Sequence, residues 1–160
     1  MGEQARPGGV TSSGRIGRAG ARPLRIPGYR LLGVAGKGGM GVVYRGVQES
    51  IGREVAIKVL PPGAGRSRRY VERFLREARA AARLNHPNIV AAIDAGRAGP
   101  LVYFVMEYVD GETAGDLVDR EGPLPLERVL EILLGVARAL EHAHREGLVH
   151  RDVKPDNIML

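Results

Sequence analysis

The segment Gly36–Val43 holds the first residues whose types and spacing could do chemistry. It reads GKGGMGVV and fits the pattern G-x-G-x-x-G-x-V through Gly36, Gly38, Gly41 and Val43. Glycine lets the backbone come close to a phosphate and point its N–H groups at the oxygens. Taken alone, the pattern also fits a dinucleotide-binding turn or a plain hairpin turn. The dinucleotide turn needs a helix directly after the glycines, whereas VVYRGV here is typical of a strand.

The use of lysine narrows these alternatives. Of 24 Lys and Arg residues, only three are Lys: Lys37, Lys58 and Lys154. Codon bias alone would leave the few Lys residues at arbitrary positions. Lys58, however, stands in the middle of the expected strand VAIK, where a buried ammonium group needs a partner. The helix that follows offers Glu77, although a Glu on a helix is also an ordinary surface residue.

A third group of residues, HRDVKPDN at His150–Asn157, follows the other two along the chain. The order G-x-G-x-x-G-x-V, VAIK, HRDVKPDN resembles a protein kinase, specifically the bacterial serine/threonine kinases with GGMG in the glycine loop. The resemblance implies that Asp152 accepts the proton of the substrate hydroxyl and that Asn157 holds Mg²⁺. It also implies that Lys154 steadies the transferred phosphate, which favours Ser and Thr as substrates.

The resemblance assigns an ATP site to the first half of the chain. It implies that Lys58 holds the α- and β-phosphates and pairs with Glu77. LVYFVMEYVDG resembles the kinase hinge, where the backbones of Glu107 and Val109 would meet the adenine edge. Without the family, most of these residues are ordinary strand hydrophobes. The implied ATP-binding residues are Ala35, Gly36, Lys37, Gly38, Gly39, Met40, Gly41, Val43, Ala56, Lys58, Met106, Glu107, Val109 and Met159.

The chain departs from the family in two ways. Ala35 stands where the family usually has Leu or Ile as a lid over adenine. The D-F-G, activation-loop and A-P-E segments do not occur in these 160 residues. We therefore expect an N-terminal kinase fragment that transfers phosphate poorly on its own. The alternative is a non-catalytic ATP-binding or protein-interaction module from a truncated kinase gene.

The elements that must position these residues make an α+β fold. Alternating and β-branched patterns predict strands over residues 29–35, 41–48, 54–60, 89–94 and 101–109. Helical spacing predicts helices over 70–84, 114–120 and 125–145. The resemblance implies a five-stranded antiparallel N-lobe with one helix, and the first helices of a helical C-lobe. The expected divisions are a tail at 1–27, an N-lobe at 28–106, a hinge at 107–111 and the start of the C-lobe at 112–160.

The expected helix at 125–145 is apolar on most of its sides. A helix of this kind is usually buried on most of its sides. The helices that would cover it in a whole kinase domain are absent from the chain, so we expect its open faces to favour self-association.

Composition excludes several other classes of protein. The chain has no Cys, hence no disulfide or thiolate metal site, which fits a cytoplasmic location. It has no run of about 18 apolar residues, so we expect no membrane span. The net charge is +6, and the tail holds five Arg and one Glu. A disordered leader explains this tail better than a nucleic-acid arm, because the tail has no aromatic residue to stack on a base. We therefore expect protein substrates bearing Ser or Thr, and no nucleic-acid partner.

Overall fold

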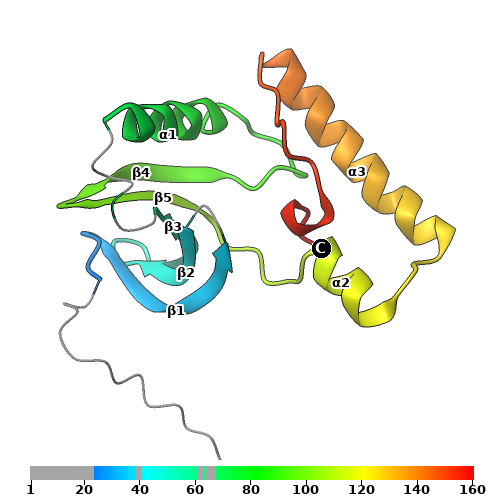
Figure 1. Cartoon of the computed structure of the whole chain (residues 1–160), viewed down its shortest axis with the longest axis horizontal. Coiled ribbons are helices and arrows are strands. Elements are labelled where there is room, and N and C mark those ends of the chain that lie inside the picture. Colours follow the sequence, from blue (N-terminus) through cyan, green and yellow to red (C-terminus); the bar gives the residue numbers. More distant parts are fainter. Residues whose placement is uncertain (1–23, 39–40, 61–62, 64–67) are drawn as a thin grey trace, which may run out of the picture.

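The computed structural model describes residues 24–38, 41–60, 63 and 68–160. Its sheet has five antiparallel strands in the order β1-β2-β3-β5-β4 (Figure 1). The predicted α+β fold with a five-stranded antiparallel sheet is confirmed. The elements are β1 (Tyr29–Gly38), β2 (Gly41–Gln48), β3 (Arg53–Val59), α1 (Arg68–Ala81), β4 (Ala92–Ala98), β5 (Leu101–Glu107), α2 (Ala114–Glu121), α3 (Leu126–Arg145) and the 3₁₀ turn η2 (Pro155–Asn157).

One face of the sheet carries the main core. Tyr44, Ile57 and Val105 lie opposite one another across β2, β3 and β5, so their side chains share this face. Ile57 and Val105 are completely buried. They pack with Val55 and Tyr103 in one apolar cluster. The β-branched residues that predicted these strands therefore form the core of the sheet.

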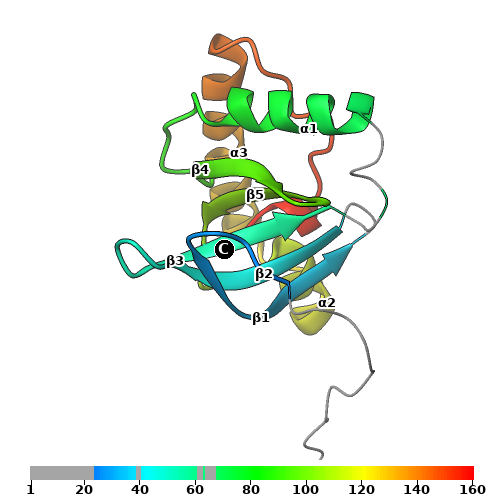
Figure 2. The same cartoon turned by 90° about the vertical axis from the view of Figure 1, so that its left-hand side faces the viewer.

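The other face of the sheet carries α1. Lys58 lies opposite Phe104 in the ladder between β3 and β5. The ring of Phe74 in α1 meets that of Phe104 edge-on, at 6.4 Å between centroids. Val71 of α1 packs beside Val102 in a second, smaller core. Figure 2 shows α1 lying alongside β4 and β5, on the face that also carries Lys58.

The helices α2 and α3 lie apart from the sheet, beyond the segment that follows β5 (Figure 1). One contact between the two parts is a stack of the His86 and His142 rings, 5.3 Å apart. His86 precedes β4, and His142 lies near the end of α3. This stack helps to hold α3 against the connection between α1 and β4.

The predicted boundary of the tail at residue 27 is wrong. Leu24 packs against the main core, and Ile26 is 3% exposed and pairs with Tyr29 in an isolated bridge. The reason is that these apolar side chains bury surface against the sheet, which the Arg and Gly content of the segment obscured. Residues 1–23, for which we predicted disorder, lie outside the described residues.

Several element ends differ from prediction. The helix α1 begins at Arg68 and ends at Ala81, where Leu84 N–H bonds to Ala81 O in a tighter turn. The strand β4 covers Ala92–Ala98 in place of the predicted 89–94, because its partner β5 pairs with it up to the turn at Gly99. Pro125 caps α3 and is not its first residue.

The open apolar faces predicted for α3 are present in this structure. Ala143 is its only buried residue. Leu126 is 68% exposed, and Leu130, Leu133 and Leu134 are all more than half exposed. No other element in the described part of the chain lies over these side chains. In the described residues no helix is both long enough and apolar enough to cross a membrane.

Candidate active site

The glycine loop is the end of a hairpin between β1 and β2. Gly36 pairs with Val43, and Gly38 pairs with Gly41. Gly41 has a φ of +129°, and a Cβ there would lie 2.2 Å from the carbonyl oxygen of Val59. Only glycine fits such an approach. Gly39 and Met40, both predicted to contact ATP, lie outside the described residues.

The register of β2, β3 and β5 places predicted ATP contacts in adjacent rows on one face. Val43 lies opposite Lys58, and Ala56, two residues earlier on β3, lies opposite Met106. Residues two apart on a strand share a face. The four side chains therefore form one half-buried surface, with Lys58 in the row next to the glycine loop. Ala35, the predicted lid, is exposed on β1.

Glu77 lies in a different arrangement from the one implied by the kinase resemblance. Its carboxylate forms an ion pair with Arg73, one turn earlier on α1, at 2.9 Å. Both side chains are more than 60% exposed. Among the described residues no ion pair joins Lys58 to Glu77. An exposed pair at this spacing stabilises a helix by only about 0.3–0.5 kcal/mol, so it is easily exchanged for another partner.

The predicted catalytic residues are close together. Asn157 donates from Nδ2 to the Oδ2 atom of Asp152 at 3.0 Å and to its backbone oxygen at 2.8 Å. The Nζ atom of Lys154 lies 3.4 Å from the same Oδ2. The hydrogen bond from Asn157, and after it the bond and charge of Lys154, lower the pKa of the Asp152 carboxyl. Asp152 is therefore ionised at neutral pH and able to accept a proton.

The backbone of the predicted catalytic loop carries one strained residue. Arg151 has a φ of +65°, which makes it the only non-glycine residue of the described chain with a positive φ. Such a conformation costs about 1–3 kcal/mol and persists where the surroundings enforce it. Asp152 follows directly and bonds from its N–H to His150 Nδ1 at 3.3 Å. The unusual backbone turns the chain just before the predicted catalytic carboxylate.

The segment after the loop is anchored to the start of α2. Ala114 N–H donates to Ile158 O at 2.8 Å, and Leu160 N–H donates to Glu112 O at 2.9 Å. A Cβ on Gly111 would lie 2.0 Å from the backbone oxygen of Leu160, so these two segments of the chain approach as closely as a glycine allows. The loop thus depends on the position of the segment that leaves the hinge.

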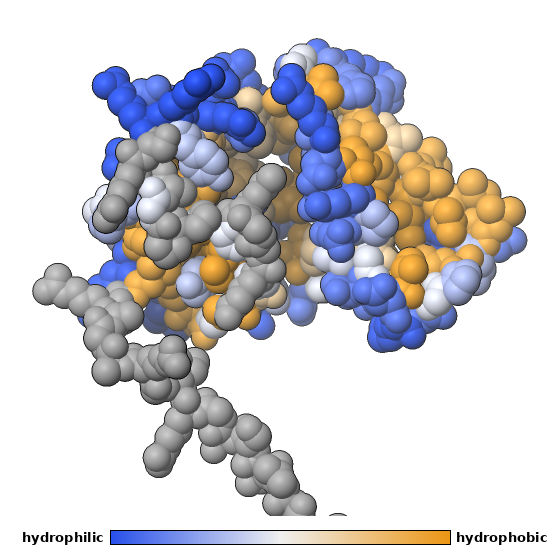
Figure 3. Space-filling model, in the orientation of Figure 1, coloured by the Kyte–Doolittle hydropathy of each residue, from blue (hydrophilic) through white to orange (hydrophobic). Residues whose placement is uncertain are grey.

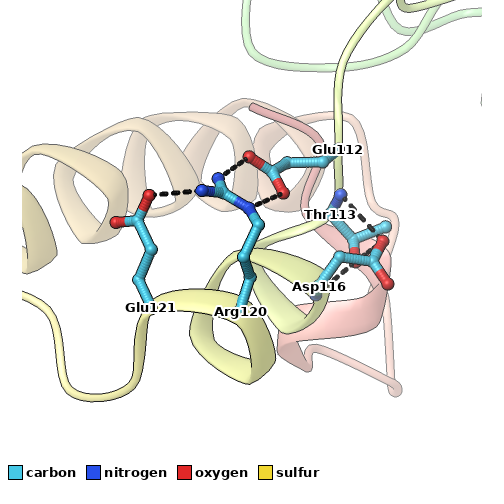
Figure 4. A network of polar contacts seen from close by, with 5 residues as sticks. All are labelled: Glu112, Thr113, Asp116, Arg120 and Glu121. Atoms are coloured by element: carbon cyan, nitrogen blue, oxygen red, sulfur yellow. Dashed lines mark hydrogen bonds and ion pairs between the residues drawn. The ribbon is translucent and has the colours of Figure 1, made fainter. Parts of the chain in front are cut away.

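Polar side chains stabilise that segment in turn (Figure 4). Thr113 accepts a hydrogen bond from the backbone of Asp116, whose carboxylate accepts one from the backbone of Thr113, which makes a capping box. Glu112 and Glu121 both bind the guanidinium of Arg120. These contacts fix where α2 begins and, through it, where the catalytic loop lies.

A cavity of 700 Å³ lies between the connection before β4, the helix α3 and the catalytic loop. It brings together Glu107, Val109 and Met159, which were predicted to contact adenine, with Lys154 and Asn157. The N–H of Glu107 already donates to Ala91 O at 2.9 Å, so this residue has its carbonyl group to offer. Val43, Ala56 and Met106 do not line this cavity, because they lie on the sheet side.

The sequence reasoning missed one residue of this region, Arg45. Its guanidinium binds the carboxylate of Glu54 and lies 4.8 Å from the centre of the Tyr108 ring. The sequence offered one signal for this residue, namely its spacing from Val43. Arg45 is two residues after Val43 on the same strand, and therefore on the same face.

The described residues contain no group of three or more His, Asp or Glu side chains arranged for a metal. Asn157 turns its amide nitrogen to Asp152, which leaves its amide oxygen able to bind a metal ion. Oxygen donors suit Mg²⁺, which is commonly held by one or two side chains together with substrate phosphates. The residues present therefore fit a Mg²⁺ ion bound with a nucleotide.

Residues 29–160 match the profile of the protein kinase domain. The chain belongs to the protein kinase family. It is similar to the serine/threonine-protein kinase PknB of Mycobacterium leprae, at 46% identity over 136 residues. It is also 46% identical over 143 residues to a probable serine/threonine-protein kinase of Streptomyces coelicolor. These matches cover 82% and 86% of this chain, and 22% and 21% of the relatives, so the chain spans about a fifth of their length.

The solved structures agree with this family. The chain is similar to the crystal structure of the PknI kinase domain of Mycobacterium tuberculosis, with a TM-score of 0.75 and 38% identity. That match covers 89% of this chain and 58% of the solved one. The chain therefore has the protein kinase fold over the region from β1 to η2.

Proposed function

We propose that this chain is the nucleotide-binding and catalytic-loop part of an ATP-dependent kinase that phosphorylates Ser and Thr hydroxyls of proteins. The observation that carries the proposal is the group formed by Asp152, Lys154 and Asn157, in which both other side chains bind the Asp152 carboxylate. Its supporting context is the sheet face with Lys58, in a chain of the protein kinase family.

The sheet face supports binding of ATP. Val43 and Ala56 offer apolar surface to an adenine ring, and the carbonyl of Glu107 offers a hydrogen-bond acceptor at the hinge. The backbone N–H groups of the glycine loop would face the phosphates. Lys58 lies in the row next to Ala56 and supplies a positive charge for the α- and β-phosphates.

The catalytic loop supports transfer of the phosphate to a hydroxyl. Asp152 would orient the hydroxyl and accept its proton, because its carboxylate is ionised and exposed. Lys154 would offset negative charge on the transferred group. Asn157 would hold Mg²⁺, which when bound neutralises phosphate charge and aligns the phosphate oxygens.

The ion pair of Glu77 with Arg73 bears on how the site would become active. The role proposed for Glu77 as partner of Lys58 requires Glu77 to leave Arg73. The cost is small, because the present pair is exposed. We propose that ATP binding or further residues of the protein favour this exchange, and that the chain alone transfers phosphate poorly until it occurs.

The proposed substrates are proteins with Ser or Thr, and the need for ATP favours a cytoplasmic location for this domain. The exposed leucines of α3 provide apolar surface for self-association or for further elements of a kinase domain. The runner-up, a non-catalytic ATP-binding or protein-interaction module, is an outcome of the test below.

The test is titration of the full-length protein with Mg·ATP, followed by phosphotransfer to a generic Ser/Thr protein substrate. We expect saturable binding that Lys58→Met weakens about tenfold or more, because a charge-assisted contact to the phosphates is lost. Arg53→Met, which removes an exposed cation from the same strand, is the control and should bind as the wild type does.

Two results would change the proposal. Equal affinities for the wild type and Lys58→Met would refute the nucleotide site on the sheet. Binding that is normal and sensitive to Lys58→Met, with no phosphotransfer from the full-length protein, would favour the non-catalytic module.

A further inference from the structure

Arg45 makes contacts with two different parts of the molecule. Its Nη2 atom lies 2.8 and 2.9 Å from the two carboxylate oxygens of Glu54. The centre of its guanidinium lies 4.8 Å from the centre of the Tyr108 ring. The first contact stays within the hairpin of β2 and β3, and the second reaches the hinge. A cation at this distance from an aromatic ring is attracted to it.

The position of Arg45 relates it to the proposed nucleotide site. Arg45 lies opposite Ala56, and Ala56 lies opposite Met106. Tyr108 follows two residues after Met106, between Glu107 and Val109, whose backbones were predicted to meet adenine. The contact between Arg45 and Tyr108 therefore joins the sheet wall of the proposed adenine site to its hinge wall.

The chemistry of the contact favours arginine. A guanidinium is flat, so one edge can bind a carboxylate while its face lies on an aromatic ring. Hydrogen bonding and charge from Glu54 raise the pKa of Arg45, which keeps the group charged. Glu54 thus orients the guanidinium toward Tyr108. A lysine would keep the charge but could not form both contacts with one planar group.

We propose that Arg45 is a positioning residue for the nucleotide, which holds Tyr108 and the hinge at a set distance from the sheet. This inference rests on the proposed function and adds a residue to the same site. Without the contact, the hinge backbone is free to move away from Ala56. The adenine then loses its fit between the two walls, and the nucleotide dissociates faster.

The adenine end and the phosphate end of the site can be separated by the choice of probe. Adenosine has no phosphates, so its affinity reports on the adenine end alone. Arg45→Ala should weaken the binding of adenosine and of ATP by the same factor, about two- to fivefold for a partly exposed cation–aromatic contact. Lys58→Met should weaken ATP far more than adenosine.

The experiment measures equilibrium affinity and dissociation rate for both probes in the full-length protein. The variants are Arg45→Ala, Tyr108→Ala and their combination. We expect the double variant to bind no more weakly than the single variant with the lower affinity, because the same contact is lost in all three. Tyr108→Phe keeps the ring and should bind as the wild type does. Arg30→Ala, which removes an exposed cation from β1, is the matched control.

A purely structural role for Arg45 predicts different results. It would lower the thermal midpoint of Arg45→Ala and leave the affinity of Tyr108→Ala unchanged, since Tyr108 lies outside the ladder of β2 and β3. Normal adenosine affinity in both single variants, or additive losses in the double variant, would overturn the inference. If Arg45→Ala fails to fold, Tyr108→Ala against Tyr108→Phe decides the question.

The test also separates this inference from the proposed function. Saturable binding that responds to Lys58→Met but not to Arg45→Ala refutes only the role of Arg45. Absence of saturable ATP binding in the wild type refutes both.

Discussion

The sheet region and the helical region of this protein are stabilised in different ways. Among the residues that the structure describes, the largest fully buried side chains are those of Val55, Ile57, Val102 and Val105, which belong to β3 and β5. The helix α3 buries only Ala143 and leaves its leucines exposed. In Figure 3 the apolar surface gathers over α3, whereas the surface over α1 is polar.

The difference separates binding from catalysis. Residues proposed to meet the nucleotide lie on strands whose opposite face is a packed core, so their spacing is rigid. Asp152 and Asn157 lie in a loop where every residue from Arg151 to Asn157 is exposed, and they are held by polar contacts with each other and by the backbone bonds to α2. The nucleotide face is therefore expected to be more tolerant of changes elsewhere than the catalytic loop.

The largest effect should come from the catalytic loop. Asp152→Asn in the full-length protein should lower the rate of phosphotransfer by about 10²- to 10⁴-fold, since a positioned general base contributes that much. ATP affinity should stay within about twofold, because the sheet face is unchanged. Asp119→Asn, an exposed acid on α2, is the control. Robust turnover in Asp152→Asn would mean that another group accepts the proton.

Substitutions in the sheet region and in the helical region should also have very different effects on stability. Ile57→Ala removes a completely buried side chain and should lower the free energy of unfolding by about 2–5 kcal/mol. Leu133→Ala, at 54% exposed, should change it by less than about 0.5 kcal/mol. Denaturant unfolding of the 160-residue chain measures both. A large loss in Leu133→Ala would show that α3 is covered in solution by an element outside this structure.

The stability of the protein and the position of the catalytic loop should both depend on the capping box of α2. Thr113→Ala removes the side chain that accepts from Asp116 and should cost about 1 kcal/mol of stability. Phosphotransfer should also fall, because the Ile158 and Leu160 backbones bond next to this cap. Thr113→Ser keeps the hydroxyl and should restore both. A variant that loses stability but keeps its full rate would show that the cap does not position the loop.

The smallest effect concerns the protonation of Asp152. Asn157 donates to the charged carboxylate, so Asn157→Ala should raise the pKa of Asp152 toward its ordinary value. In the wild type this contribution to stability is present above the pKa of the unfolded chain and is lost as the pH falls through the lower folded pKa. Carboxyl chemical shifts followed by NMR give the midpoint. Gln48→Ala, on β2, should leave it unchanged.

The sequence by itself determined the family and the sheet, and it predicted that Asp152, Lys154 and Asn157 act together in catalysis. The motifs that hold Gly36, Lys58 and Asp152 are local, and each demands a specific residue type at a specific spacing. The strands were predictable because their β-branched residues face a core. The capping box of α2 has a local pattern as well, although only its helix was predicted.

Only the tertiary structure decided which residues meet across elements. The partner of Glu77 is Arg73 in place of Lys58, because the position of α1 against the sheet depends on packing between Phe74 and Phe104. The contact of Arg45 with Tyr108 joins residues far apart in the chain. Composition also led us to assign Ile26 to the tail, since its burial depends on packing against strands that follow it in the sequence. Such contacts depend on distances between elements, which no local pattern contains.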